Sequence, residues 1–263
     1  RATDVTGEIE TAVGERVDLR SLPTWTIDPV DAQDFDDAIS IAVDDAAIRL
    51  WVHIADVSHY VQPGTAMWDE AIARANTVYL PGYTVHMLPP VLAETVCSLV
   101  PAEDRLAHTV AMVLDPETLS FESIEIHKSV IHSDARLTYR EAEAILDGEE
   151  HSLAGALAEM YTLAEALHEQ RKDDGSLVLN PRRDRAHTIV EEAMLKANRA
   201  VTHELMWNRG VEAVYRVHPQ PTPTPWDQAL RESVEIDGVS ISRAADDEAR
   251  RAVHDALERS VRV

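Results

Sequence analysis

The sequence contains almost no cysteine, few aromatic residues and no long apolar run. Cys97 is the only cysteine among 263 residues, which excludes an internal disulfide and any zinc module built on several cysteines. A single thiol is typical of a reducing compartment, so we expect a cytoplasmic protein. No apolar stretch approaches the ~18 residues that cross a bilayer, and no signal peptide opens the chain, so we expect no membrane association.

Positive charge is also scarce. The chain has 24 Lys and Arg against 47 Asp and Glu, a net charge of -23. The imbalance is concentrated in residues 1–150, which carry 28 acidic and 9 basic side chains, whereas residues 151–263 carry 19 and 15. Nonspecific nucleic-acid binding normally depends on Lys and Arg. A nucleic-acid function would therefore need bound cations, or a more basic neighbouring domain.

The order of apolar patterns predicts an α+β fold, with strands first and helices later. Two β-branched runs, 37–43 and 48–55, predict a hairpin, and 106–114 and 121–131 predict two more strands. The stretch from Tyr79 to Pro90 is too apolar to be solvated, so we expect an ordered loop there. Helical spacing and capping signals predict the remaining elements: helices over 65–75, 138–148, 153–172, 186–207 and 244–261, with a short strand at 214–217 and a stiff proline-rich loop at 218–225.

Five aspartates lie within ten residues, and apolar residues flank them on both sides. Two neighbouring carboxylates repel by about 1 kcal/mol in water and by more where they are partly buried. A hard divalent cation such as Mg²⁺ or Mn²⁺ relieves this repulsion, because it prefers carboxylate oxygen. Asp28, Asp34 and Asp36 share parity and would project from one face of an extended segment, whereas Asp37 needs a turn or bulge to join them.

Other interpretations of the acidic run were compared with a metal site. A solvated acidic loop fits poorly with the apolar flanks. An EF-hand loop needs glycine at its sixth position and glutamate at its twelfth, and counting from Asp34 these are Ile39 and Asp45. A phospho-accepting aspartate with acidic helpers remains open on chemistry alone.

Two further groups of residues were considered. His53, Asp56 and His59 have a spacing that suits Zn²⁺, but their position on an apolar strand and its exit favours structural roles. Cys97 lies in apolar surroundings with no adjacent base, which favours a buried structural residue over a nucleophile.

The segment Thr26–Ala38 (TIDPVDAQDFDDA) resembles the signature of the ribonuclease II / ribonuclease R family, the RNB catalytic domain. Further blocks agree with that family in the same order, and together they extend from about Leu19 to His218. These blocks are 52–61, 79–82 with 87–89, 97–99 with 104–106, 135–139, 189–195 and 215–218.

The resemblance implies an RNB-type fold, a curved and mostly antiparallel sheet with helices packed around an RNA channel. It assigns 26–263 to the catalytic domain, incomplete at its C-terminal end, and 1–25 to a connector with a short strand. The implied activity is processive 3′→5′ hydrolysis of single-stranded RNA to nucleoside 5′-monophosphates, using two Mg²⁺ ions or Mn²⁺ in their place.

The resemblance also implies roles for individual residues. Asp28, Asp34, Asp36 and Asp37 would be the metal and catalytic carboxylates, with Asp36 the most important for the chemical step. The remaining matches concern RNA binding: Tyr79 clamps the 3′-terminal nucleotide, Tyr139 lines the channel, Glu191 contacts the terminal nucleotide, and Leu179 stands where the family commonly has a stacking phenylalanine. Independently of the resemblance, the basic patch that includes Arg182 and Arg183 is as compatible with phosphate contacts as with a solvated turn.

Three departures from the family pattern keep alternatives open. Leu179 replaces an aromatic residue, the link from Ser176 to Arg183 is short, and the sequence stops at Val263, just before the position of an arginine-containing family motif. We expect accessory OB-fold RNA-binding domains outside this chain. The alternatives are a catalytically impaired RNB-like module that binds RNA or a protein, and a metal-dependent phosphatase or DNA nuclease.

Overall fold

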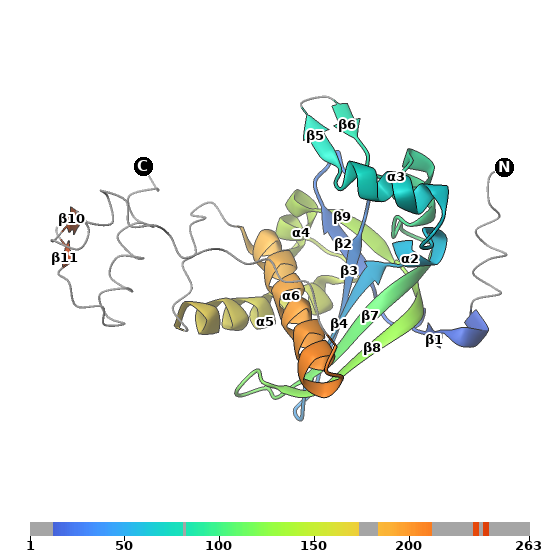
Figure 1. Cartoon of the computed structure of the whole chain (residues 1–263). Coiled ribbons are helices and arrows are strands. Elements are labelled where there is room, and N and C mark those ends of the chain that lie inside the picture. The colour runs from blue at the N-terminus through green and yellow to red at the C-terminus, as the bar shows by residue number, and fades with distance from the viewer. Residues whose placement is uncertain (1–12, 81–82, 174–183, 212–233, 237–238, 242–263) are drawn as a thin grey trace.

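The computed structural model describes residues 13–80, 83–173, 184–211, 234–236 and 239–241. Its main feature is a seven-stranded sheet in the order β1-β8-β7-β4-β3-β2-β9 (Figure 1). The four inner pairings are antiparallel and the two edge pairings are parallel, so the prediction of a mostly antiparallel sheet is confirmed. The strands, in sheet order, are β1 (Val17–Asp18), β8 (Phe121–His132), β7 (Asp104–Leu114), β4 (Ile48–Ala55), β3 (Asp37–Val43), β2 (Trp25–Asp28) and β9 (Ala135–Thr138).

The β3–β4 hairpin has the bounds that the sequence predicts. Its turn is closed by the Asp44 carboxylate, which accepts hydrogen bonds from the backbone N–H groups of Ala46 and Ala47 at 2.9 and 3.0 Å. Aspartate stabilises turns in this way, which is why the short polar segment between two β-branched runs was informative. Strands β7 and β8 also lie where expected, and β1 is the short strand expected in the connector.

Three helices pack against one face of the sheet. They are α4 (Tyr139–Leu146), α5 (Ala154–Asp173) and α6 (Arg185–Thr202), and the short π-helical segment η3 (His203–Asn208) continues α6 (Figure 1). The predicted helix over 186–207 therefore comprises α6 and η3. The larger core lies between helices and sheet, with fully buried side chains that include Leu50, Met112, Leu157, Met160 and Ile189.

A smaller apolar cluster lies on the other face of the sheet, since strand residues alternate between faces. Phe35, Ala38, Cys97 and Leu99 belong to it, with partly buried side chains from α2 (Val57–Tyr60) and η2 (Val91–Val96). Cys97 is a free, buried thiol, and burial raises its pKa to about 12. The interpretation of Cys97 as a structural residue is therefore supported.

The prediction of a loop over Tyr79–Pro90 was wrong. The chain forms a small hairpin from β5 (Val78–Leu80) and β6 (Tyr83–Val85), which stands beside α3 (Ala66–Arg74). Its apolar side chains are exposed, including Tyr79, Leu80 and Tyr83, so high apolar content did not mean burial here. Helix α3 begins as predicted, because the Thr65 hydroxyl caps it by accepting from the Trp68 N–H.

The remaining described segments are η1 (Val13–Glu15) and the strands β10 (Val234–Ile236) and β11 (Val239–Ile241), which pair with each other. The strand predicted at 214–217, the loop at 218–225 and the helix at 244–261 lie outside the described residues. Among the described helices, none combines the length and apolarity that a membrane crossing needs.

Candidate functional site

The ends of two neighbouring strands position Asp28 and Asp37. Trp25 of β2 pairs with Ile39 of β3 in antiparallel register, so the end of β2 lies beside the start of β3. Asp28 is the last residue of β2 and Asp37 is the first of β3. The two carboxylates, nine positions apart in sequence, therefore meet at one edge of the sheet.

The segment between these strands is held by Phe35. Its side chain is 8% exposed in the smaller core cluster. Its backbone N–H donates to Ser98 Oγ at 2.9 Å, and its carbonyl accepts from the Leu99 N–H at 2.8 Å. Since side chains alternate along an extended segment, inward-pointing Phe35 directs Asp34 and Asp36 away from the core.

The four carboxylates influence one another's ionisation. Burial is the largest cause of a raised pKa at Asp28, Asp36 and Asp37, and neighbouring aspartates add to it in each case. Asp34 acts on Asp28 and on Asp36, while Asp28 and Asp36 both act on Asp37. The pKa of Asp37 reaches about 6. The structure thus brings the four predicted aspartates within electrostatic range of one another, and at Asp28 the Thr26 hydroxyl and Arg136 offset part of the rise in pKa.

The donor atoms of this site suit a hard cation. Asp28 Oδ2 is buried and has no hydrogen-bond partner among the described residues, which is costly unless a ligand or ion is present. As the described side chains stand, however, no three of the His, Cys, Asp and Glu residues converge on one point as a formed metal shell would. The donor type, carboxylate oxygen, is the one that Mg²⁺ and Mn²⁺ prefer.

Tyr79 reaches the acidic site from the β5–β6 hairpin. Its hydroxyl donates to Asp34 Oδ2 at 2.8 Å, and this hydrogen bond is the main cause that raises the pKa of Tyr79 to about 12. The side chain is 66% exposed. The aromatic ring is therefore placed beside the carboxylates with most of its surface available for contact.

Tyr139 reaches the same site from another direction. Strands β2 and β9 run in parallel with Asp28 opposite Thr138, so the next residue, Tyr139, begins α4 beside the acidic site. Burial raises the pKa of Tyr139, and the charges of Asp28, Asp37 and Asp184 raise it further. Its ring stacks on His187 of α6. The sequence analysis did not identify Asp184 or His187, because only the tertiary packing of α6 brings them here.

Arg136 is another neighbour that the sequence analysis did not single out. Its guanidinium lies 5.3 Å from the centre of the Phe35 ring and donates to the Pro29 carbonyl. Its positive charge offsets part of the rise in the pKa of Asp28. Arg136 comes close to Asp28 only through strand pairing, because Arg136 of β9 lies opposite Thr26 of β2, and Thr26 is two residues before Asp28.

Of the remaining predicted RNA-binding residues, the structure describes only Glu191. Glu191 lies on α6, one turn after His187, and pairs with Arg171 at 2.9 Å. Arg171 also binds the buried Glu192 at 2.6 Å. Leu179, Arg182 and Arg183 lie outside the described residues, so their predicted contacts stay predictions.

The residues considered for zinc have structural partners. His53 is fully buried, with Nε2 3.0 Å from Ser40 Oγ and Nδ1 2.7 Å from Thr109 Oγ1. The Asp56 side chain is buried and forms an ion pair of 2.6 Å with Arg16. The structural interpretation of His53 and Asp56 is therefore supported.

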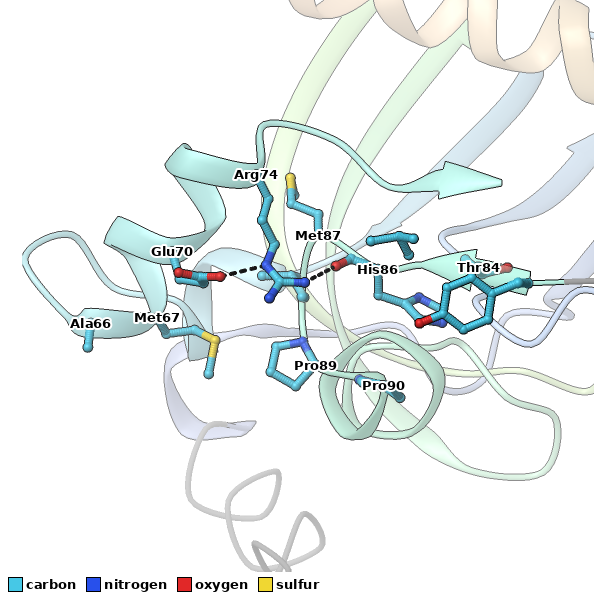
Figure 2. A pocket seen from close by; sticks show the side chains of 12 residues that line it. Ala66, Met67, Glu70, Arg74, Thr84, His86, Met87, Pro89 and Pro90 are labelled. Atoms are coloured by element: carbon cyan, nitrogen blue, oxygen red, sulfur yellow. Dashed lines mark hydrogen bonds and ion pairs between the residues drawn. The ribbon is translucent and has the colours of Figure 1, made fainter. Parts of the chain in front are cut away.

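A separate hollow of about 530 Å³ lies between α3 on one side and β6 with the segment that follows it on the other. Figure 2 shows Arg74 between Glu70 and His86, and its guanidinium donates to the Glu70 carboxylate at 2.7 Å and to the His86 carbonyl at 3.0 Å. Met67, Met87 and two prolines supply apolar walls. None of the predicted site residues lines this hollow.

The fold and site together define a class: an α+β domain with a carboxylate centre at the edge of its sheet and two tyrosines directed toward it. A model of the RNB domain family matches residues 16–262. The chain belongs to the RNB domain family, which confirms the resemblance seen in the seven sequence blocks.

The chain is similar to known ribonucleases. It is 40% identical over 238 residues to Ribonuclease R of Vibrio parahaemolyticus, with 81% of this chain and 28% of that protein covered. The apo form of Mycoplasma genitalium RNase R superimposes with a TM-score of 0.81 at 27% identity, covering 95% of this chain and 42% of that one. The same M. genitalium enzyme bound to ribose-methylated single-stranded RNA gives a TM-score of 0.75 at 28% identity, with coverages of 82% and 37%. The chain spans 28–34% of the length of the curated Ribonuclease R relatives it matches.

Proposed function

We propose that this chain is the catalytic domain of an Mg²⁺-dependent 3′→5′ exoribonuclease that hydrolyses single-stranded RNA to nucleoside 5′-monophosphates. The observation that carries the proposal is the gathering of Asp28, Asp34, Asp36 and Asp37 at one sheet edge, with Asp28 Oδ2 buried and unbonded within the described residues. Membership of the RNB family, and relatives named Ribonuclease R, direct this chemistry toward RNA.

In this proposal the four aspartates hold Mg²⁺, or Mn²⁺ in its place. Cations held there would supply Lewis-acid chemistry, namely polarisation of the scissile phosphate, a lowered pKa for a water molecule and neutralisation of the leaving 3′-oxygen. The carboxylates themselves supply fixed negative charge in a partly buried setting, and Phe35 and Ser98 keep their loop in place. No side chain here needs to act as a nucleophile.

The two tyrosines would grip the end of the strand. Stacking of a base on an aromatic side chain is worth about 1–3 kcal/mol and tolerates any base, which suits an enzyme that degrades RNA of any sequence. The exposed ring of Tyr79 and the partly buried ring of Tyr139 lie next to the carboxylates through Asp34 and Asp28 respectively. Contacts to the ribose 2′-hydroxyl would explain a preference for RNA over DNA.

The net charge of -23 gives cations a second role. A polyanionic strand approaches an acidic domain slowly unless metal ions or basic partners reduce the repulsion. We propose that bound Mg²⁺ supplies part of this compensation, and that OB-fold RNA-binding domains outside this chain supply the rest.

The proposal is tested by incubating the chain with single-stranded RNA labelled at its 3′ end, with Mg²⁺ or with EDTA, and separating the products by chromatography. We expect labelled mononucleotide to appear from the start of the reaction with Mg²⁺ and not with EDTA. Internal fragments would contradict an exonuclease. A matched DNA oligomer separates a ribonuclease from a DNA nuclease, and free phosphate as the product would identify a phosphatase.

A second candidate is an RNB-like module that binds RNA without cleaving it, and Leu179 in place of an aromatic residue is the feature that favours it. The same assay distinguishes the two candidates. RNA binding without product at any concentration of Mg²⁺ or Mn²⁺ would support this second function.

A further inference from the structure

Two side chains at the start of α6 are tied to each other. Asp184 caps the helix, and its Oδ1 accepts a hydrogen bond from the His187 backbone N–H at 2.8 Å. The same oxygen lies 2.5 Å from His187 Nδ1. One carboxylate oxygen therefore fixes both the backbone and the ring of His187, which limits the rotation of the imidazole.

The fixed imidazole lies flat on Tyr139. The two ring centres are 3.6 Å apart and the ring planes differ by 3°. Aromatic pairs usually prefer offset or edge-to-face contacts, so a nearly parallel pair at this distance indicates that both rings are held from outside. Asp184 holds His187, while pairing of β9 with β2 and the Thr138–Glu141 capping box hold the backbone of Tyr139.

The stack is not needed to join α4 and α6. Arg185 already does this, since its guanidinium binds Glu143 and its neighbour Ala186 donates a backbone N–H to the same carboxylate at 2.8 Å. The His187 side chain is 49% exposed, so its removal leaves no large cavity. A packing role alone does not account for the arrangement.

We infer that His187, oriented by Asp184, is a positioning residue that holds the Tyr139 ring in place beside the aspartates for the 3′ end of the RNA. This inference rests on the proposed function. His187 covers one face of the Tyr139 ring, which is partly buried and also packs against the larger core, so the RNA would meet the part of the side chain that stays exposed. Without His187 the Tyr139 side chain gains rotational freedom. RNA binding then loses more conformational entropy, because it must order this side chain.

The first measurement is the affinity for a fluorescent single-stranded RNA in EDTA, where hydrolysis is absent, followed by KM and kcat with Mg²⁺. We expect His187→Ala to weaken binding and raise KM by about two- to tenfold, from the usual strength of an aromatic pair, with kcat changed little. His187→Phe keeps a flat ring and should restore most of the affinity. His127→Ala on β8, another partly exposed histidine, is the matched control and should behave as the wild type.

A double-mutant cycle shows whether His187 acts through Tyr139. In a Tyr139→Ala background, His187→Ala should have no further effect on binding. If His187→Ala alters stability, Asp184→Asn provides a second variant, because asparagine still caps the helix while its bond to the imidazole loses the charge. Asp184→Asn should raise KM in the same direction by a smaller factor.

Several results would overturn the inference. These are unchanged RNA affinity in His187→Ala, failure of phenylalanine to restore binding, or an equal effect of His187→Ala with and without Tyr139. A wild-type chain that neither binds nor hydrolyses RNA would instead overturn the proposed function. The two failures are therefore distinguishable.

Discussion

The sheet carries two groups of polar side chains that the fold treats differently. One is a polar row of five buried residues that cross the sheet: Thr24, Ser40, His53, Thr109 and Ser129. The other is the acidic site. In the polar row each side chain is hydrogen-bonded to the next. In the acidic site neighbouring carboxylates raise one another's pKa, and Asp28 Oδ2 has no partner among the described residues. The polar row is therefore satisfied within the fold, whereas the acidic site is not.

The polar row is continuous. Its successive contacts measure 2.8, 3.0, 2.7 and 2.6 Å, from Thr24 through Ser40, His53 and Thr109 to Ser129. Burial lowers the pKa of His53 to about 3, so the imidazole is neutral at pH 7 and donates from one nitrogen while it accepts at the other. The row therefore needs no ion, in contrast to the acidic site.

The largest effect that separates the two groups concerns catalysis. Asp36→Asn removes one charge from the acidic site and should lower kcat by about a thousandfold, because groups that stabilise transition-state charge have effects of about this size. RNA affinity should remain close to that of the wild type, because uncharged contacts remain. Binding by anisotropy and turnover by product chromatography check this. Equal loss of both would show that the role assigned to Asp36 is wrong.

The next effect concerns stability. His53→Ala breaks the polar row, leaves a cavity and removes one hydrogen bond each from Ser40 and Thr109, which keep their bonds to Thr24 and Ser129. This should lower the free energy of unfolding by about 2–4 kcal/mol. The activity per folded molecule should not change. Urea denaturation measures the first quantity and turnover at low temperature the second. Thr109→Val is the matched control that keeps the volume, and it should cost less.

Substitution of Asp37 should raise the free energy of unfolding, whereas substitution of His53 lowers it. The pKa of Asp37 is about 6 in the folded chain against 3.8 as a free side chain. A raised pKa means that the ionised Asp37 carboxylate destabilises the folded chain. This destabilisation is absent below pH 3.8, grows between pH 3.8 and 6, and is complete above pH 6. Asp37→Asn should therefore stabilise the chain in EDTA by about 1–3 kcal/mol at pH 7 and by almost nothing at pH 3.5. Thermal melts at both pH values, with and without Mg²⁺, test this. A variant that is less stable than the wild type at pH 7 would contradict it.

The smallest effect is expected at Tyr79. Tyr79→Phe removes the hydroxyl bound to Asp34 and keeps the ring, so kcat/KM should fall by only about fivefold, or ~1 kcal/mol. Tyr79→Ala also loses base stacking, so its kcat/KM should fall further. If phenylalanine and alanine are equally impaired, the hydroxyl and not the ring is the important group.

The features that sequence predicted correctly have local causes. Alternating β-branched residues around Asp44 define the β3–β4 hairpin, and Thr138 with Glu141 define the start of α4, each within a few residues. The acidic run was recognisable because its charges adjoin apolar strands in the sequence itself. These signals need no knowledge of distant parts of the chain.

The features that sequence missed depend on register and packing. Arg136 acts on Asp28 through the β2–β9 pairing, and His187 reaches Tyr139 through the position of α6; no local pattern encodes either. The stretch that includes the β5–β6 hairpin was predicted as an ordered loop because it is too apolar to be solvated, yet the structure exposes Tyr79 and Tyr83. Apolar content predicts burial only where a partner surface exists to cover it.

The hairpin has one more consequence. Neither α3 nor the two strands of the hairpin contribute a fully buried side chain, so this unit has little to hold it against local opening. Its amides should exchange with deuterated solvent well before those of β4 and β7. Tyr79 is thus carried by a part of the domain that opens readily while the aspartates sit on a part that does not. The 3′ end of an RNA would then contact a rigid sheet through the aspartates and a flexible hairpin through Tyr79.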